Sequence, residues 1–184
     1  MSQSAPQQTG GQVFIDESKA KDYLLVGAVI HPRQLAFARK AMRNLILPGQ
    51  RRLHMFKESD QRKKQIISVI ADLEIAITVY QKVGNKRNEI NNRNACITAL
   101  LYDSIRSKRD GLIFEMDQSS EHRDRQHIAA TLRMQNLRKD LTYEHRFPSE
   151  EPLLAIPDAV AWAWARGGDW RRRVDPLVTV QTVP

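Results

Sequence analysis

The sequence contains almost no cysteine and no long apolar run. Its 184 residues include a single cysteine, Cys96, which excludes an internal disulfide and a zinc site built on cysteine pairs. No apolar segment approaches the roughly 20 residues that a membrane-spanning helix requires. The first residues, MSQSAPQQTGGQ, lack the apolar core of a signal peptide or anchor. These absences predict a protein of the reducing cytoplasm without a membrane anchor, and we interpret residues 1–12 as a disordered tail.

The sequence also lacks the short motifs that identify several enzyme classes. It has neither a GxxxxGK[ST] nor a GxGxxG segment, so a nucleotide-binding loop of either kind is unsupported. It has no nucleophile elbow and no convincing serine for a Ser-His-Asp hydrolase. Acidic residues are outnumbered, 21 against 29 Lys and Arg, which gives a formal net charge of +8. This excess of positive charge predicts an anionic partner, with nucleic acid as the leading candidate.

Segments with strand and helix periodicity alternate along the chain. Apolar and β-branched residues favour strands at residues 13–16, 23–30, 53–56, 75–82, 111–118 and 141–147. Apolar residues spaced three and four apart favour helices over residues 33–47, 59–73, 90–105, 121–137 and 157–167. The first two strands are joined by a polar turn and form an antiparallel hairpin, whereas crossover connections follow. We therefore predict a single α/β domain over residues 13–184, with a central mixed sheet flanked by helices.

Acidic residues lie at the points where predicted strands end and a helix begins. Asp16 closes the first strand, Asp117 closes the strand LIFEMD, and Asp158 opens the last helix. The alternation of side chains along a strand places Glu115 on the same face as Asp117. Ligands of open α/β sheets gather at strand ends, where converging carboxylates repel one another unless a cation neutralises them. Carboxylate oxygens suit Mg²⁺ or Mn²⁺, and such a site could hydrolyse a phosphodiester bond.

Each acid also has a simpler interpretation. Asp16 and Glu17 are ordinary residues for the turn of a hairpin. Proline followed by Asp158 is a usual helix start, where the helix dipole favours an acid. Asp117 could belong to a loop in which a serine caps the next helix. Individually these signals are weak, and it is their joint placement that favours a metal site.

The order of these motifs resembles a known family. FIDES, YLLVGAVI, LIFEMD and PLLAIPDAVAWAWAR, spread over roughly residues 13–168, resemble domain of unknown function 3800, a bacterial family with an RNase H-like fold. The resemblance implies that fold and metal binding by Asp16, Asp117 and Asp158. A fourth acid, which RNase H-like enzymes often supply, would be Glu58 or Glu115, and Glu115 is preferred for its shared face with Asp117.

Basic residues provide candidates for contact with a nucleic acid backbone. Such contacts position a substrate without reading its sequence, and Trp170 could stack on a base beside the arginines that follow it, although tryptophans more often pack in a core. The candidates are Arg51, Arg52, Lys86, Arg87, Trp170, Arg171, Arg172 and Arg173.

Two functions remain open from the sequence. The first is a nuclease that hydrolyses RNA or DNA with Mg²⁺ or Mn²⁺ bound by carboxylates, in which Asp16, Asp117, Asp158 and Glu115 are the catalytic candidates. The second is an inactive domain of the same fold that binds nucleic acid or a protein partner, as a homo-oligomer or within a larger assembly.

Overall fold

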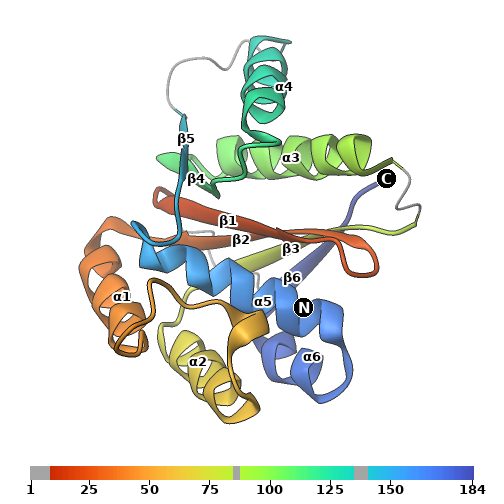
Figure 1. Cartoon of the computed structure of the whole chain (residues 1–184). Helices are drawn as coiled ribbons and strands as arrows, with labels where there is room; N and C mark the ends of the chain where they lie inside the picture. Colours follow the sequence, from red (N-terminus) through yellow and green to blue (C-terminus); the bar gives the residue numbers. More distant parts are fainter. Residues whose placement is uncertain (1–8, 85–87, 135–140) are drawn as a thin grey trace, which may run out of the picture.

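The computed structural model describes residues 9–84, 88–134 and 141–184, which form a six-stranded sheet with helices on both faces (Figure 1). The strands are β1 (Gln12–Ser18), β2 (Tyr23–Ile30), β3 (Ala76–Lys82), β4 (Gly111–Glu115), β5 (Thr142–Arg146) and β6 (Val178–Thr182). The helices are α1 (Pro32–Asn44), α2 (Asp60–Asp72), α3 (Glu89–Arg106), α4 (Glu121–Met134), α5 (Ala155–Arg166) and α6 (Gly168–Val174). Short 3₁₀ helices lie at η1 (Met55–Lys57), η3 (Pro152–Leu154) and η4 (Asp175–Leu177).

The strands follow the spatial order β5-β4-β1-β2-β3-β6. β1 and β2 form an antiparallel hairpin, and β3 pairs antiparallel with β2. β4 runs parallel to β1, β5 parallel to β4, and β6 parallel to β3. Figure 1 shows α3 and α4 above the sheet and α1, α2, α5 and α6 below it. The predicted mixed sheet, its N-terminal hairpin and its flanking helices are therefore confirmed.

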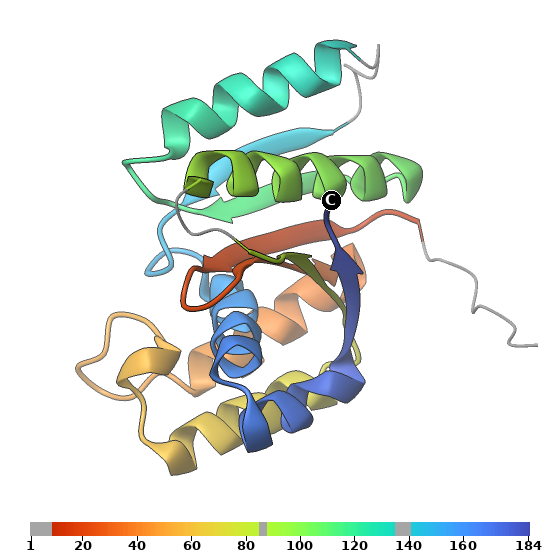
Figure 2. The same cartoon turned by 90° about the vertical axis from the view of Figure 1, so that its right-hand side faces the viewer.

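The two faces of the sheet bury separate cores because successive strand residues point to opposite faces. Phe14 of β1 and Ile113 of β4 pack with residues of α1, α2 and α5. Ile15 and Phe114 pack with residues of α3 and α4 on the other face. The chain end follows β6 along β3 toward α3 (Figure 2), where Val183 joins this second core. The position of a residue along β1 or β4 thus decides which helices its side chain meets.

Gly27 of β2 lies where α3 packs closely on the sheet. A Cβ atom at Gly27 would lie 3.1 Å from the Cγ1 atom of Val13 and 3.3 Å from the Cδ1 atom of Leu100. We expect Gly27→Val to lower the free energy of unfolding by about 1–3 kcal/mol, because the larger side chain overpacks this core. Urea unfolding measures the change, and Thr179→Val, at an exposed position of the edge strand β6, should change it by less than about 0.5 kcal/mol. Equal effects of the two substitutions would contradict the tight packing.

Several predicted element boundaries are corrected by the structure. Residues 53–56, expected as a strand, form none, and Met55 and Phe56 lie in η1, because the Lys57 N–H bonds to the His54 carbonyl at 2.9 Å and turns the chain. β4 ends at Glu115 rather than at residue 118, and α5 begins two residues earlier than predicted. The short elements α6 and β6 were not predicted, because a seven-residue helix with three arginines and a half-exposed edge strand leave little apolar periodicity.

The predicted tail of residues 1–12 is too long. The N–H of Gly10 bonds to the Lys108 carbonyl at 3.0 Å, and the N–H of Gly11 bonds to the Asp110 carboxylate at 2.7 Å. Both glycines have positive φ angles, 81° and 92°, which a residue without a Cβ adopts readily. This bend leads the chain beside the loop before β4, and Gln12 is already the first residue of β1. Residues 1–8 lie outside the described residues.

Candidate active site

Two of the predicted acids are brought together by the parallel pairing of β1 and β4. Ile15 pairs with Phe114 in this register, so the next residues, Asp16 and Glu115, lie side by side. Both follow a residue of the α3 face and therefore point to the face that α5 covers. The prediction that Asp16 closes the first strand is corrected, because β1 continues to Ser18 and Asp16 pairs with Val26 inside the hairpin. Glu115 is the direct neighbour of Asp16 on the parallel strand.

Asp158 reaches the same place from α5, which packs on β1 and β2. The α5 helix begins at Ala155, so Asp158 lies in its first turn but is not the residue that starts it. Its Oδ2 atom accepts a hydrogen bond from the Met55 N–H at 2.9 Å and lies 3.6 Å from the Nδ1 atom of His54. Asp158 therefore holds the loop before α2 against the sheet in addition to carrying charge. We call Asp16, Glu115 and Asp158 the carboxylate cluster.

Two members of the carboxylate cluster, Asp16 and Glu115, resist ionisation. Burial raises the pKa of Asp16 well above its usual value, and the negative charges of Glu115 and Asp158 raise it further, against smaller lowering effects of Arg52 and Arg93. Burial also raises the pKa of Glu115, and Asp158 adds to this effect, although Arg52 and His54 partly offset it. A cavity that gathers carboxylates and raises their pKa values in this way is typical of functional sites.

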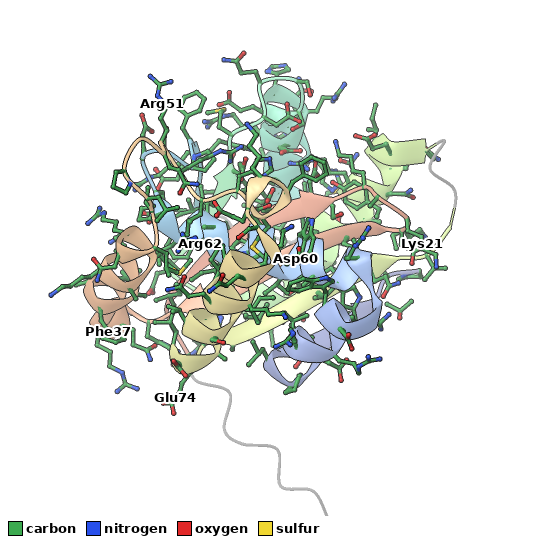
Figure 3. The ribbon with its side chains drawn as sticks, turned by 60° about the horizontal axis from the view of Figure 1, so that its bottom comes forward. Lys21, Phe37, Arg51, Asp60, Arg62 and Glu74 are labelled. Carbon is green, nitrogen blue, oxygen red and sulfur yellow. The ribbon has the colours of Figure 1, made fainter. Side chains whose placement is uncertain are left out.

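Arg52 provides the principal positive charge in the cluster. Its NH1 atom donates to the Oε1 atom of Glu115 at 2.9 Å, so this residue contacts an acid of the site rather than lying free for a phosphate. Arg51, the other basic residue predicted in this loop, is exposed and extends from the loop after α1 (Figure 3). Both arginines line a cavity of about 550 Å³ that Glu115 also borders.

Asp117 differs from the other predicted ligands. Because β4 ends at Glu115, strand alternation does not extend to Asp117 and cannot fix its face. The Asp117 carboxylate accepts the Ser119 N–H at 2.9 Å and the Ser119 hydroxyl at 2.7 Å, and the hydroxyl bond is the main reason its pKa is lowered. Asp117 still lines a cavity of about 150 Å³ together with Asp16 and Glu115. Its role as a metal ligand stays a prediction.

The carboxylate cluster fits a hard divalent cation in its chemistry. It offers carboxylate oxygens, which Mg²⁺ and Mn²⁺ prefer, and a cation would relieve the repulsion that raises the pKa of Asp16. Within the described residues, however, no group of three or more His, Cys, Asp or Glu side chains lies close enough to hold a metal ion. The donor atoms are thus of the right kind, but their side chains would have to move together to bind a metal.

Glu17 points to the opposite face, toward α3 and α4, where it joins a buried polar network that the sequence did not reveal. Its carboxylate contacts the Arg93 guanidinium and the Tyr23 hydroxyl. Arg93 also donates two bonds to Asp124, of 2.7 and 2.6 Å, and His145 lies 3.2 Å from the same carboxylate. Arg93, Asp124 and His145 are all buried, so this network fixes β1 against α3, α4 and β5 directly behind Asp16.

The position of Arg93 on α3 is the signal that could have revealed this network. Ile90, at the start of the helix predicted over residues 90–105, is half-exposed, whereas the buried face includes Arg93, Ile97 and Leu100. Arg93 precedes Ile97 by one helical turn, so a charged residue occupies a core position. A buried arginine requires acidic partners, and Glu17 supplies one of them.

The basic residues predicted at the end of the chain are held by local contacts. The Trp170 ring packs edge-on against Trp162 with 5.1 Å between centroids, which agrees with the packing interpretation. Arg171 lies 3.9 Å above the ring of Trp164, and Arg172 pairs with Asp169. Arg173 is exposed. Contact of these residues with nucleic acid stays a prediction. Lys86 and Arg87 lie outside the described residues.

The comparisons with known proteins bear on the fold. No family model matches the sequence, and no curated protein matches it. RNase HII of Archaeoglobus fulgidus, solved as its complex with PCNA, is similar in structure with a TM-score of 0.52 at 14% identity, over 91% of this chain and 76% of that chain. Bst-RNase HIII in complex with Mn²⁺ gives a TM-score of 0.48 at 11% identity, over 85% of this chain and 52% of that chain.

In the part of the chain that the structure describes, no helix has the length and apolar character needed to span a bilayer. The described strands lie in the order β5-β4-β1-β2-β3-β6. The structural similarity to RNase HII covers 91% of this chain. The chain therefore has an RNase H-like α/β fold, with its carboxylate cluster at the ends of β1 and β4 beneath α5.

Proposed function

We propose that this protein is a metal-dependent nuclease that hydrolyses phosphodiester bonds of RNA or DNA in the cytoplasm. The observation that supports the proposal is the carboxylate cluster, in which Asp16, Glu115 and Asp158 come from three separate elements onto one face of an RNase H-like sheet. Burial, and then repulsion between the acids, raises the pKa of Asp16 and Glu115, so the fold keeps acids together at a stability cost. Such costs are typical of functional sites.

In this proposal the chain's own residues bind a cation and hold the substrate. Asp16, Glu115 and Asp158 are the ligands we assign to Mg²⁺ or Mn²⁺, and Asp117 can add an oxygen from the rim of the smaller cavity. When bound, such a cation lowers the pKa of water and stabilises charge on the leaving oxygen. Arg52, now paired with Glu115, becomes free to contact a phosphate once a cation neutralises that acid.

The test is a cleavage assay with the wild type and Asp16→Asn. Both proteins are incubated with single- and double-stranded DNA, RNA and RNA–DNA hybrids, with Mn²⁺, Mg²⁺ or chelator. We expect cleavage by the wild type with a divalent cation only, and none above background by Asp16→Asn, because the amide removes the charge that binds the cation. Asp72→Asn, at an exposed position near the end of α2, should cleave as the wild type does. Cleavage that persists in Asp16→Asn or in chelator would contradict the mechanism.

A second candidate function is a nucleic-acid-binding or partner-binding domain without catalysis. The ion pair of Arg52 with Glu115 favours it, because this guanidinium already neutralises one acid of the cluster. The same assay separates the two functions, since salt-sensitive binding of nucleic acid with every substrate left intact would support the binding domain and contradict the nuclease.

A further inference from the structure

A basic pocket lies directly beside the carboxylate cluster. It has a volume of about 550 Å³ and is lined by the loop that precedes α2 and by the ends of β4 and β5. Glu115 and Met116 border both this pocket and the smaller cavity that holds Asp16, so the two spaces adjoin. A pocket of this size is within the range of roughly 300–1,000 Å³ that small-molecule-sized groups occupy in proteins.

Positive charge in the basic pocket is available for a ligand. Arg51 and Lys57 line it, both are exposed, and neither side chain has a hydrogen bond or ion pair within the described residues. Figure 3 shows Arg51 on the outer edge of its loop. Arg52 and His54 lie deeper, beside the acids Glu115 and Asp158. The pocket thus presents exposed cations together with Glu115, the acid that it shares with the cavity of Asp16, an arrangement that suits a phosphate bound near a carboxylate-held metal.

The same pocket presents an exposed aromatic ring. Phe147, just after β5, lines the pocket with 44% of its surface exposed. Its backbone is held in a turn, because its carbonyl accepts the N–H groups of Glu150 at 2.9 Å and Glu151 at 3.1 Å. Glu151 is in turn fixed by the Arg39 guanidinium of α1, at 2.8 Å. An apolar ring kept in solvent on an anchored turn is available for stacking, and phenylalanine rings stack on unpaired bases regardless of sequence.

We propose that the basic pocket receives one unpaired nucleotide of a single-stranded nucleic acid, with its base stacked on Phe147 and its phosphate bound by Arg51 and Lys57. A base inside a duplex is already stacked on both faces, and its ring cannot enter a concave pocket unless it leaves the stack. The substrate class that fits is therefore single-stranded RNA or DNA, or a strand with an unpaired nucleotide. That the adjacent phosphodiester then lies over the carboxylate cluster rests on the proposed nuclease function.

The test measures binding in chelator, so that it does not depend on cleavage. A labelled oligonucleotide of roughly 12 nucleotides is titrated with the protein as a single strand and as a duplex of the same sequence. We expect the wild type to bind the single strand at least about 10-fold more tightly, and Phe147→Ala to weaken that binding by about 10-fold, the size expected for loss of stacking on one base. Phe37→Ala is the matched control, because Phe37 is 67% exposed on α1 and does not line the pocket (Figure 3).

Two further arms isolate the roles of shape and charge. Phe147→Trp should retain the affinity of the wild type. Phe147→Leu should weaken the binding as much as Phe147→Ala does. The leucine variant keeps the test valid even if the alanine variant folds poorly. Replacing both Arg51 and Lys57 with alanine should reduce the salt dependence of single-strand binding by about 0.7 in slope, since the two residues bind one phosphate and each neutralised phosphate contributes about 0.7. An unchanged slope would overturn the phosphate assignment.

The outcomes separate this inference from the nuclease proposal. Equal or tighter binding of the duplex, or unchanged affinity in Phe147→Ala and Phe147→Leu, would overturn the inference even if the protein cleaves. Displacement of the oligonucleotide by an equal concentration of free mononucleotides would also overturn it, because the ligand would then be a free nucleotide. Phe147-dependent binding of single strands without cleavage in Mn²⁺ would support the inference and contradict the nuclease.

Discussion

Arg93→Met is expected to lower the free energy of unfolding by about 3–5 kcal/mol, the range observed when one partner of a buried ion pair is removed. Arg93 is 8% exposed and holds Asp124, which is 1% exposed, through two short hydrogen bonds. It also contacts Glu17 and lies 3.0 Å from the Tyr23 hydroxyl. Methionine fills much of the same volume but leaves the buried Asp124 without its guanidinium partner, and leaves Lys19, at 2.9 Å, as the one ion-pair partner of Glu17 within the described residues.

Urea unfolding near neutral pH measures this loss, and Arg106→Met on the same helix is its control. Arg106 is 70% exposed, and within the described residues its one ion pair is with Asp103 on the same helix, so its replacement should cost less than about 1 kcal/mol. The double variant Arg93→Met with Asp124→Leu should recover part of the loss, because the stranded acid is then also removed. Equal effects of Arg93→Met and Arg106→Met would show that the network does not stabilise the fold.

The same network determines how the stability of the folded protein changes as pH falls. Burial alone would raise the pKa of Asp124, but the hydrogen bonds from Arg93 and His145 outweigh it and the pKa is lowered. A lowered pKa contributes stability above the ordinary aspartate range, and this contribution is lost as pH falls through the lowered value. In Arg93→Met the same carboxylate keeps its burial but loses its strongest partner, so its pKa rises and acid unfolding begins at higher pH.

The hairpin and the position of Asp16 could be predicted because both depend on local sequence. Apolar residues on either side of a polar turn define β1 and β2, and the alternation of faces follows from strand geometry. Asp16 therefore points to one face and Glu17 to the other whatever surrounds them.

The partners of these acids could not be predicted because they depend on strand register and on contacts between distant segments. Glu115 meets Asp16 only because Ile15 pairs with Phe114, which is a property of the assembled sheet. Arg52 reaches Glu115 across 63 positions of sequence, and Arg93 reaches Glu17 across 76. Asp117 was favoured because an apolar strand appeared to continue to it, whereas the chain turns after Glu115 and Ser119 binds its carboxylate.

Asp16→Asn is expected to raise the free energy of unfolding by about 1 kcal/mol near neutral pH in chelator, which is a common gain when a functional residue is replaced. Burial and the charges of Glu115 and Asp158 raise the pKa of Asp16 in the folded protein. When the pKa of Asp16 is higher in the folded than in the unfolded protein, the folded protein binds more protons than the unfolded one at pH values between the two pKa values. The free energy of unfolding of the wild type therefore falls as pH rises from the ordinary aspartate pKa through the raised value, and asparagine removes the contribution of Asp16 to this fall.

A divalent cation should reverse the order of the two proteins. A ligand that binds only the folded state stabilises it by about 2.7 kcal/mol at a concentration of 100 times its Kd. Mn²⁺ should therefore stabilise the wild type, in which it neutralises the carboxylate cluster, and leave Asp16→Asn close to its value in chelator. Urea unfolding from about pH 4 to about pH 8, with and without Mn²⁺, measures both effects. Asp72→Asn should respond to Mn²⁺ as the wild type does.

The pH arm and the Mn²⁺ arm test different claims about the same residue. A gain in stability without a response to Mn²⁺ in either protein would show that Asp16 is strained by its neighbours but that the site binds no metal. That result would favour the binding domain, in which Arg52 alone balances the cluster. Equal stabilisation of both proteins by Mn²⁺ would place the ion elsewhere. No gain in chelator would contradict the repulsion itself, because asparagine keeps the shape of Asp16 and removes only its charge.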